Sequence, residues 1–322
     1  MIKNKLQDAA SVIMEGKNFL IMGHVNPDGD SLGCMCALGL ALRSLGKSAE
    51  MVSPDGVPEL YKFLPGSTRI LKEVPPNWMF DAAIIVDCEG LDRLGNMAEI
   101  LESCCNILEI DHHPGGKRGS ASCLVDSSAA SCGEILFEFL REIGVEITPD
   151  IADCLLTAIV TDTGSFRFSN VKSSTLHAAA SLLEAGSSIS KIAHKVYETR
   201  SLASVRLLGS VLSTLRTTAN GRIAYASITR DQMALSQAVE AEAEGIVNYV
   251  RSVRGAKVGM LFREEENGNT RVSLRSKDGT DISQIARMFG GGGHKAAAGC
   301  TVDRPMTEAI DLVVDATRKW MG

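Results

Sequence analysis

Residues 19 to 33, FLIMGHVNPDGDSLG, most constrain how this chain can fold. An apolar run stops at a polar stretch that holds His24, Asp28 and Asp30, and a new apolar-periodic segment begins at Ser31. This order predicts a buried strand, a loop at its carboxyl end, and a helix capped by Ser31. One imidazole and two carboxylates on such a loop can point at one spot. Taken alone, the stretch also fits an ordinary turn rich in Asp, Gly and Pro.

Two later apolar runs, at 81–87 and 105–111, predict further buried strands. The first ends in Asp87 and the second leads into Asp111-His112-His113. Helical patterns separate these runs, and strands that alternate with helices predict a parallel α/β sheet. The carboxyl ends of parallel strands lie at one edge of the sheet, where ligands bind. We therefore expect the polar side chains at these strand ends to cluster.

The length of 322 residues predicts two domains, because a single core rarely grows past ~250–300 residues. From Ser131 the pattern is mainly helical, and a helix opened by Pro149 leads into Asp162. We predict an N-terminal parallel-sheet domain over 1–187, a helical linker over 188–215, and a smaller α/β domain over 216–322. In the last region we expect strands at 222–228, 256–263 and 270–276, and helices at 239–251, 281–288 and 306–320.

Charge and cysteine content narrow the classes of function. The net charge of −6 argues against binding of long nucleic acid, which needs a broad basic surface, but leaves room for a small phosphorylated ligand. Nine cysteines, with no C-x-x-C pair and no secretory signal, are expected as buried reduced thiols. No apolar run reaches the ~18–20 residues of a membrane span. We therefore expect a soluble cytoplasmic protein.

The polar side chains at the predicted sheet edge suit a metal centre. Carboxylates gathered at one spot raise one another's pKa values unless cations are present. Ligation by oxygen and imidazole suits Mn²⁺, Mg²⁺ or Fe²⁺ better than structural zinc. Two ions about 3.5–4 Å apart need a bridging carboxylate, for which Asp87 is the natural candidate. Each residue alone could be a helix cap or a core histidine. The candidate cluster is His24, Asp28, Asp30, Asp87, His112, His113 and Asp162.

A glycine-rich stretch near the C-terminus, GGGGHKAAAG at 290–299, suits an anion. Glycines let backbone N–H groups approach an anion closely. We expect a helix to begin near Lys295 and to add its dipole to the same anion. Arg275, at the end of a predicted strand, could reach that anion too. The alternatives are a flexible loop for the glycines and a salt-bridged edge-strand residue for Arg275.

Taken in order, the motifs resemble those of the DHH phosphoesterase superfamily. They are HVNPDGDSLG (24–33), VD (86–87), DHH (111–113), TDTGSF (161–166) and GGGGHKAAAG (290–299), the last of which is similar to the DHHA1 module. The resemblance covers essentially the whole chain. Length and motif spacing look most like the stand-alone nanoRNase type, which comprises oligoribonucleases that also remove the 3′-phosphate from 3′-phosphoadenosine 5′-phosphate (pAp).

The resemblance implies a role for each matching residue. It implies two metal-ligand sets, one of His24, Asp28 and Asp87 and one of Asp30, Asp87, His112 and Asp162. In the family pattern His113 contacts the phosphate, and Asp111 orients the neighbouring imidazoles. In the C-terminal module the implied substrate-binding residues are Arg275 and His294, followed by Gly292 and Gly293 and then by Ser276 and Lys277.

The implied activity is hydrolysis of short oligonucleotides, such as pGpG or pApA, to mononucleotides, together with removal of the 3′-phosphate of pAp. Two divalent ions, with Mn²⁺ expected first and Mg²⁺, Co²⁺ or Fe²⁺ as alternatives, would activate a water for in-line attack on phosphorus. A cleft between the two domains would admit only short substrates, and a hinge near 186–221 would let it open. A homodimer is the expected assembly by base rate.

Other functions fit part of the pattern. A manganese pyrophosphatase shares the metal motifs but is not expected to carry the glycine-rich module. A RecJ-like exonuclease would be longer and more basic, and a membrane-bound cyclic-dinucleotide phosphodiesterase would carry membrane segments. Activity on linear dinucleotides derived from cyclic ones stays open. A nucleotide sensor without turnover would lack one of Asp28, Asp30, Asp87 and Asp162, which are all present.

Overall fold

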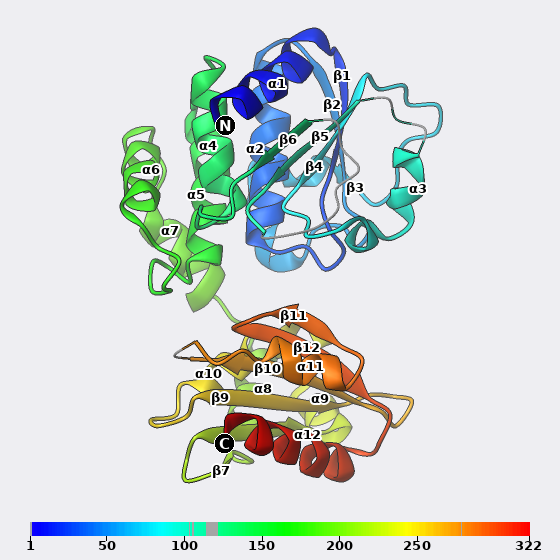
Figure 1. The fold of residues 1–322 in the computed structure, drawn as a ribbon, viewed down its shortest axis with the longest axis vertical. Coiled ribbons are helices and arrows are strands. Elements are labelled where there is room, and N and C mark those ends of the chain that lie inside the picture. Colours follow the sequence, from blue (N-terminus) through cyan, green and yellow to red (C-terminus); the bar gives the residue numbers. More distant parts are fainter. Residues whose placement is uncertain (1, 103, 105, 114–121, 278) are drawn as a thin grey trace. The chain divides into compact units, whose positions relative to one another are not determined.

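The fold is that of a computed structural model, which describes residues 2–102, 104, 106–113, 122–277 and 279–322. These residues divide into two compact units, one ending at Thr199 and the other starting at Arg200. Figure 1 shows the chain from its N-terminal strands and helices to the C-terminal helix. No helix among the described residues is both long enough and apolar enough to cross a membrane.

The first unit is built on a six-stranded sheet whose strands are all parallel, in the order β3-β2-β1-β4-β5-β6. The parallel sheet expected from the apolar runs is confirmed, whereas β3 and β6 were not expected. Between β1 and β4 the strand order reverses direction, and at such a switch point the loops diverge and leave a crevice. The strands are β1 (Asn18–Met22), β2 (Ser48–Val52), β3 (Ile70–Leu71), β4 (Ala82–Val86), β5 (Ile107–Asp111) and β6 (Ser122–Val125).

Helices cover both faces of this sheet, which explains the continuous apolar runs. Phe19 and Ile21 point to a core shared with α2, α4 and α5, and Leu20 and Met22 point to a smaller core under η3 and α3. The helices are α1 (Ile2–Glu15), α2 (Gly29–Ser44), η1 (Glu59–Tyr61), η2 (Ser67–Arg69), η3 (Leu91–Met97), α3 (Ala98–Leu101), α4 (Cys132–Glu142), α5 (Pro149–Asp162), α6 (Ser173–Glu184), α7 (Ile189–Ala193) and η4 (His194–Glu198).

Two glycines let α2, α4 and α5 approach closely. A Cβ on Gly33 of α2 would lie 2.5 Å from the carbonyl oxygen of Cys154 in α5. A Cβ on Gly133 of α4 would lie 2.6 Å from the Cβ of Ala158, also in α5. Figure 1 shows these helices on one side of the sheet, with α4 and α5 in green beside α2 in blue. The amino-terminal parts of α2 and α4 are thereby held against the middle of α5.

The expected cap of α2 is wrong by three residues. The helix begins at Gly29, and its N-cap is Asp28 rather than Ser31. The carboxylate of Asp28 accepts hydrogen bonds from the backbone amides of Asp30 and Ser31 at 3.0 and 3.1 Å. Aspartate caps a helix as well as serine does, so the sequence is compatible with a helix that begins after either residue. The earlier start places Asp30 inside the first helical turn.

The second unit is built on a mixed sheet in the order β11-β12-β10-β9-β8-β7, in which only β8 and β9 pair in parallel. Its strands are β7 (Arg216–Thr218), β8 (Ile223–Ile228), β9 (Val258–Glu264), β10 (Thr270–Ser276), β11 (Gly292–His294) and β12 (Ala297–Val302). Its helices are α8 (Leu202–Leu212), α9 (Arg230–Ser236), η5 (Glu240–Ala243), α10 (Ile246–Arg251), α11 (Ser283–Met288) and α12 (Met306–Met321).

Two local predictions for the C-terminal half are wrong. No helix starts near Lys295: the alanine-rich segment after it is strand β12, which pairs with β10 from Ala297 opposite Arg275 to Val302 opposite Thr270. Pairing with a buried strand outweighs the helix propensity of alanine, which is a weak preference. The stretch 188–215 is not one helix, because α7 and η4 are separated from α8 by extended backbone at Thr199.

Candidate metal centre

Asp87 stands at the centre of the polar cluster. It directly follows β4, and its side chain is buried. Its backbone lies in the left-handed region at φ +53°, a conformation that aspartate tolerates better than most residues. Such a conformation at a buried position is costly and is often retained at functional sites. Here it lets the carboxylate turn across the end of the sheet.

The loop after β1 supplies the first group of ligand atoms. Nε2 of His24 lies 3.9 Å from Oδ1 of Asp28 and 3.7 Å from Oδ2 of Asp87. One ligand atom from each of these residues lies within 4.8 Å of the others, which is close enough to share one ion. Nδ1 of His24 lies 2.8 Å from the carbonyl oxygen of Val25 and 3.2 Å from Nη2 of Arg93, so Nε2 is the ring nitrogen that faces the carboxylates.

The second group lies on the other side of Asp87. Nε2 of His112 lies 3.3 Å from Oδ2 of Asp162, 3.8 Å from Oδ2 of Asp30 and 3.6 Å from Oδ1 of Asp87. Asp30, His112 and Asp162 also offer three ligand atoms within 4.8 Å of one another. The two oxygens of Asp87 therefore face different imidazoles. The structure brings all six candidate ligands from four chain segments into two adjoining groups.

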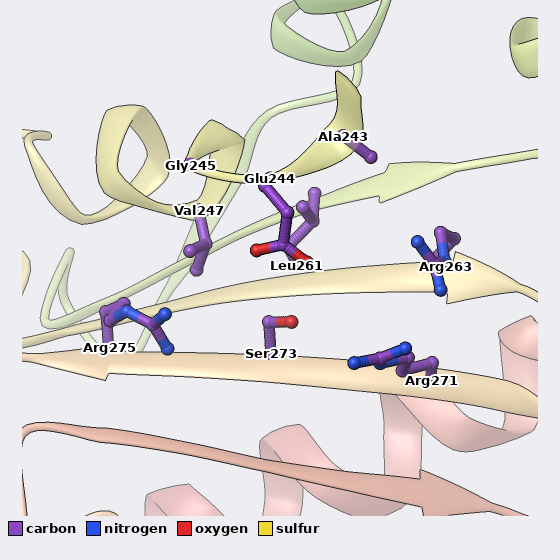
Figure 2. Close-up of a pocket in the computed structure, with 9 residues that line it drawn as sticks. All are labelled: Ala243, Glu244, Gly245, Val247, Leu261, Arg263, Arg271, Ser273 and Arg275. Atoms are coloured by element: carbon purple, nitrogen blue, oxygen red, sulfur yellow. The ribbon is translucent and has the colours of Figure 1, made fainter. Parts of the chain in front are cut away.

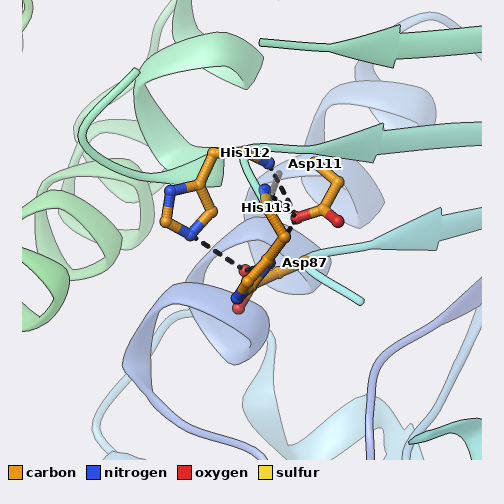
Figure 3. Close-up of side chains that lie close together, drawn as sticks. All are labelled: Asp87, Asp111, His112 and His113. Carbon is orange, nitrogen blue, oxygen red and sulfur yellow. Dashed lines mark hydrogen bonds and ion pairs between the residues drawn. The ribbon is translucent and has the colours of Figure 1, made fainter. Parts of the chain in front are cut away.

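Asp111 organises the turn that follows β5. Its fully buried Oδ1 accepts hydrogen bonds from the backbone amides of His112 and His113 at 2.7 and 3.2 Å, and it lies 2.8 Å from Nδ1 of His113. Figure 3 shows this carboxylate facing both histidines, with the ring of His112 turned toward Asp87. Asp111 thus fixes the orientation of the His113 ring.

The amino end of α4 holds Asp30, a contact that the motifs did not reveal. The backbone amides of Cys132 and Gly133 donate to Oδ2 and Oδ1 of Asp30 at 2.7 and 2.9 Å. The thiol of Cys34 lies 3.4 Å from Oδ1. Asp30 is 1% exposed, whereas the side chain of Asp28 is 54% exposed. One carboxylate of the pair is therefore immobilised and the other stands at the surface.

Asn170 is a second residue that the sequence analysis missed. Its side-chain amide donates to the carbonyl oxygens of Asp162 and Ala130 at 3.1 and 2.9 Å. Asp162 is the last residue of α5, and Gly164, Ser165 and Phe166 follow it with positive φ angles. No spacing rule relates Asn170 to the candidate ligands, so only its position eight residues after Asp162 could have drawn attention to it.

Without cations, the carboxylates of this cluster are buried beside one another with too little positive charge to balance them. Burial, and next the charge of Asp87, raise the pKa values of Asp30 and Asp162 well above their ordinary range. Burial lowers the pKa of His112 and so favours the neutral imidazole that metal binding requires. Burial also acts to lower the pKa of His113, but the hydrogen bond and charge of Asp111 outweigh it and raise the pKa to about 9.

The candidate substrate-binding residues of the second unit lie on neighbouring strands. Arg275 of β10 is opposite Ala297 of β12, and Ala297 is opposite His294 of β11. Gly293 needs its glycine, because its φ is +126° and a Cβ would lie 2.6 Å from the carbonyl oxygen of Ala297. The side chain of His294 lies outside the described part of the structure. Gly292 is also in β11, Ser276 donates its hydroxyl to the carbonyl of Thr280, and the amide of Lys277 bonds the carbonyl of Lys257.

Comparison with protein families identifies both units. The DHH family, N-terminal domain, matches residues 18–159, and the DHHA1 domain matches residues 220–322. A bifunctional oligoribonuclease and PAP phosphatase NrnA of Thermus thermophilus is 32% identical over 303 residues, which cover 93% of this chain and 89% of the relative. The NrnA protein of Bacillus subtilis is 30% identical over 283 residues, 87% of each chain.

A solved structure has the same fold throughout. The crystal structure of an exopolyphosphatase-related protein from Bacteroides fragilis is 26% identical to this chain. It matches with a TM-score of 0.93 and covers 99% of this chain and 96% of its own.

Proposed function

This chain belongs to the DHH family and carries a DHHA1 domain, and from that premise we propose that it hydrolyses short oligonucleotides to mononucleotides and removes the 3′-phosphate of pAp. The observation that carries the proposal is the position of Asp87, whose two oxygens face His24 and His112 within 3.7 Å. The relatives from Thermus thermophilus and Bacillus subtilis, which match over most of their length, are named as enzymes with both activities. The chain is accordingly a hydrolase with a metal-dependent phosphoesterase site.

The residues present fit divalent cations. Oδ1 of Asp87 is buried and has no hydrogen bond from any described residue. An orphaned carboxylate oxygen is costly unless a cation binds it. The donor set consists of carboxylate oxygens and imidazole nitrogens, which favours Mn²⁺ or Mg²⁺ over soft metals. We propose two ions, Mn²⁺ first, with Asp87 as the shared ligand of the two sets predicted from the motifs.

Bound at this site, the ions would supply the charge that lowers the pKa of a water and polarises the phosphoryl group. The protein's own residues do the rest. Asp111 raises the pKa of His113 and so favours the cationic ring, which can donate to a phosphoryl oxygen and offset the charge that builds there. The amide-bound Asp30 keeps its side of the site from moving while the phosphorus is attacked.

The second unit would hold the nucleotide. Arg275, Gly292, Gly293 and His294 are the proposed substrate-binding residues. A glycine strand edge lets backbone N–H groups approach a phosphate, and an arginine can bind it through two parallel hydrogen bonds. We place the catalytic domain at 1–187 and the nucleotide-binding domain at 216–322.

One assay separates the proposed activity from its alternatives. The chain is incubated with Mn²⁺ and, in separate reactions, with a 5′-labelled RNA dinucleotide, pAp, pyrophosphate or a cyclic dinucleotide. Mononucleotide release from the dinucleotide and AMP release from pAp are expected, with little product from the other two. Absence of mononucleotide under Mn²⁺, Mg²⁺ and Co²⁺ alike would refute the proposal. Faster hydrolysis of pyrophosphate would assign the chain to the pyrophosphatases.

A further inference from the structure

Two arginines stand directly opposite each other on β9 and β10. Arg263 pairs with Arg271 in the antiparallel register, so both side chains lie on the same face of the sheet. Like charges in this position destabilise a sheet. The side chain of Arg263 is only 12% exposed, and its ion-pair partner, Glu240, is 79% exposed and lies 3.3 Å away. An ion pair with so exposed a glutamate offsets little of the repulsion between the two arginines.

Arg275 extends the same row along β10. Residues 271, 273 and 275 point to one face because side chains alternate along a strand. Nη1 of Arg275 donates to the carbonyl of Leu274 at 3.0 Å, but its guanidinium has no ion pair within the described part of the chain. Burial lowers the pKa of Arg275, which means that its charge is poorly solvated. The hydroxyl of Ser273 stands between the two charged ends of the row.

These side chains line one pocket. Figure 2 shows Arg263 and Arg271 at one end, Arg275 at the other, and Ser273 between them. The carboxylate of Glu244 lies above Ser273 in the same view. Among the residues that line the pocket Glu244 is the one acid, against three arginines. The pocket therefore carries a net positive charge on a chain whose overall charge is −6.

We propose that the row formed by Arg263, Arg271, Ser273 and Arg275 binds successive backbone phosphates of a single-stranded oligonucleotide of three nucleotides or more. Arg271 and Arg275 are four positions apart on an extended strand, a span of about 13 Å. That span is too long for one phosphate and suits a strand that carries several. Arginine forks match phosphate oxygens, and Ser273 can donate to an oxygen between them.

This inference rests on the proposed function, and it adds a preference for length. A dinucleotide can reach only part of the row, whereas longer strands gain an arginine contact with each further phosphate. Glu244 keeps the row partly neutralised when no strand is bound. An anion would then have to displace the carboxylates of Glu244 and Glu240, which are both exposed to solvent.

The test measures binding without turnover. Fluorescein-labelled oligoadenylates of two, three and five nucleotides are titrated with the full chain in EDTA, by anisotropy, at several salt concentrations. We expect Arg263→Gln and Arg271→Gln each to weaken binding of the five-nucleotide strand roughly ten-fold. Each should also reduce the slope of log K against log salt by about 0.7. Binding of the dinucleotide should change less than two-fold.

Two further variants separate binding from folding. Arg271→Glu would form a cross-strand ion pair with Arg263, so its melting temperature should not fall although binding of the five-nucleotide strand is lost. Arg304→Gln removes one positive charge from an exposed site beside Glu308 and should leave binding unchanged. Equal losses for Arg304→Gln, or unchanged binding in both pocket variants, would overturn the proposal. Equal losses for all three strand lengths would overturn the length preference. Hydrolysis of a dinucleotide by the unmodified chain with Mn²⁺ tests the proposed function independently.

Discussion

The side-chain amide of Asn170 donates to the backbone carbonyl of Asp162 across 3.1 Å. The same amide group donates to Ala130, two residues before Cys132, whose own amide holds Asp30. Asn170 therefore ties the segment that carries one proposed ligand to the segment that orients another. Asp30 and Asp162 both face His112, so their separation depends on this tie.

Asn170→Ala should weaken one of the two proposed metal sites. Loss of a group that orients ligands typically lowers metal affinity about 10- to 100-fold. Calorimetric titration with Mn²⁺ should show one weakened binding step and one unchanged step. Asn106→Ala is the matched control, because that amide also donates to a carbonyl, Asp81 at 3.2 Å, but precedes β5 at the opposite edge of the sheet. If either variant weakened both Mn²⁺-binding steps, the role assigned to Asn170 would be contradicted.

Asp87→Asn tests the shared ligand. The amide has nearly the same size as the carboxylate, and asparagine also tolerates φ +53°. Only the charge and one acceptor change. We expect loss of two-ion binding and a fall in turnover of at least about a thousand-fold, as for a group on which several others depend. Asp87→Ala should behave likewise. Two tightly bound ions in either variant, counted by metal analysis after gel filtration, would rule out the shared role.

Gly133→Ala should destabilise the first unit. The new Cβ would lie 2.6 Å from the Cβ of Ala158, so α4 has to move away from α5. Such overpacking costs about 1–3 kcal/mol. Gly209→Ala is the control, because nothing lies within 4 Å of its Cβ position in the exposed middle of α8. It should stabilise the chain by about 0.5–1 kcal/mol. Urea titrations that show the same sign for both variants would contradict this reading.

The stability of the metal-free protein should fall as pH rises. Asp30 and Asp162 have raised pKa values in the folded chain, whereas in the unfolded chain they release their protons around the ordinary pKa of 3.8. Above that pH the folding equilibrium therefore shifts toward the unfolded chain. The raised pKa of His113 stabilises the folded chain fully below pH 6.5, and this stabilisation is lost as the pH rises to about 9.

Melting curves in EDTA and in Mn²⁺ check this direction. In EDTA the melting temperature should drop steadily over pH 6.5 to about 9, the window set by His113. Saturating Mn²⁺ should raise it most at the alkaline end, because ions bind the deprotonated carboxylates. A flat or rising profile in EDTA would count against the raised pKa values.

His294→Ala should mainly raise KM and leave kcat within a few-fold. In the proposed function His294 binds nucleotide and is not a metal ligand. Loss of one charge-assisted contact corresponds to roughly a ten-fold rise in KM. Steady-state kinetics on a labelled dinucleotide with Mn²⁺ measure both constants. A kcat that falls as far as in Asp87→Asn would place His294 in the chemical step instead.

The polar cluster could be predicted because several of its members stand where an apolar run ends. Buried parallel strands are apolar throughout, so Asp87 after β4 and His24 after β1 stand out where the apolar runs end. The ends of adjoining parallel strands must lie at one edge. The cap at Ser31 was misplaced because Asp28 caps equally well, and nothing local distinguishes the two.

The alanine-rich segment shows the limit of local patterns. Residues 297–302 form a strand rather than a helix, because each of them pairs with a residue of β10. That partner lies more than twenty residues away in sequence. Propensity, which acts within a few residues, therefore predicted a helix where a strand forms.

The sequence alone determined which residues could bind metal ions and that three of the four segments carrying them end buried strands, since periodicity and polarity are local properties of the chain. Only the tertiary structure decided that Asp30 is held by the amino end of α4, that Asn170 ties its neighbour Ala130 to Asp162, and that Arg263 faces Arg271 across two strands. Each of these contacts joins residues whose proximity depends on how helices and strands pack, and packing is a property of the whole fold.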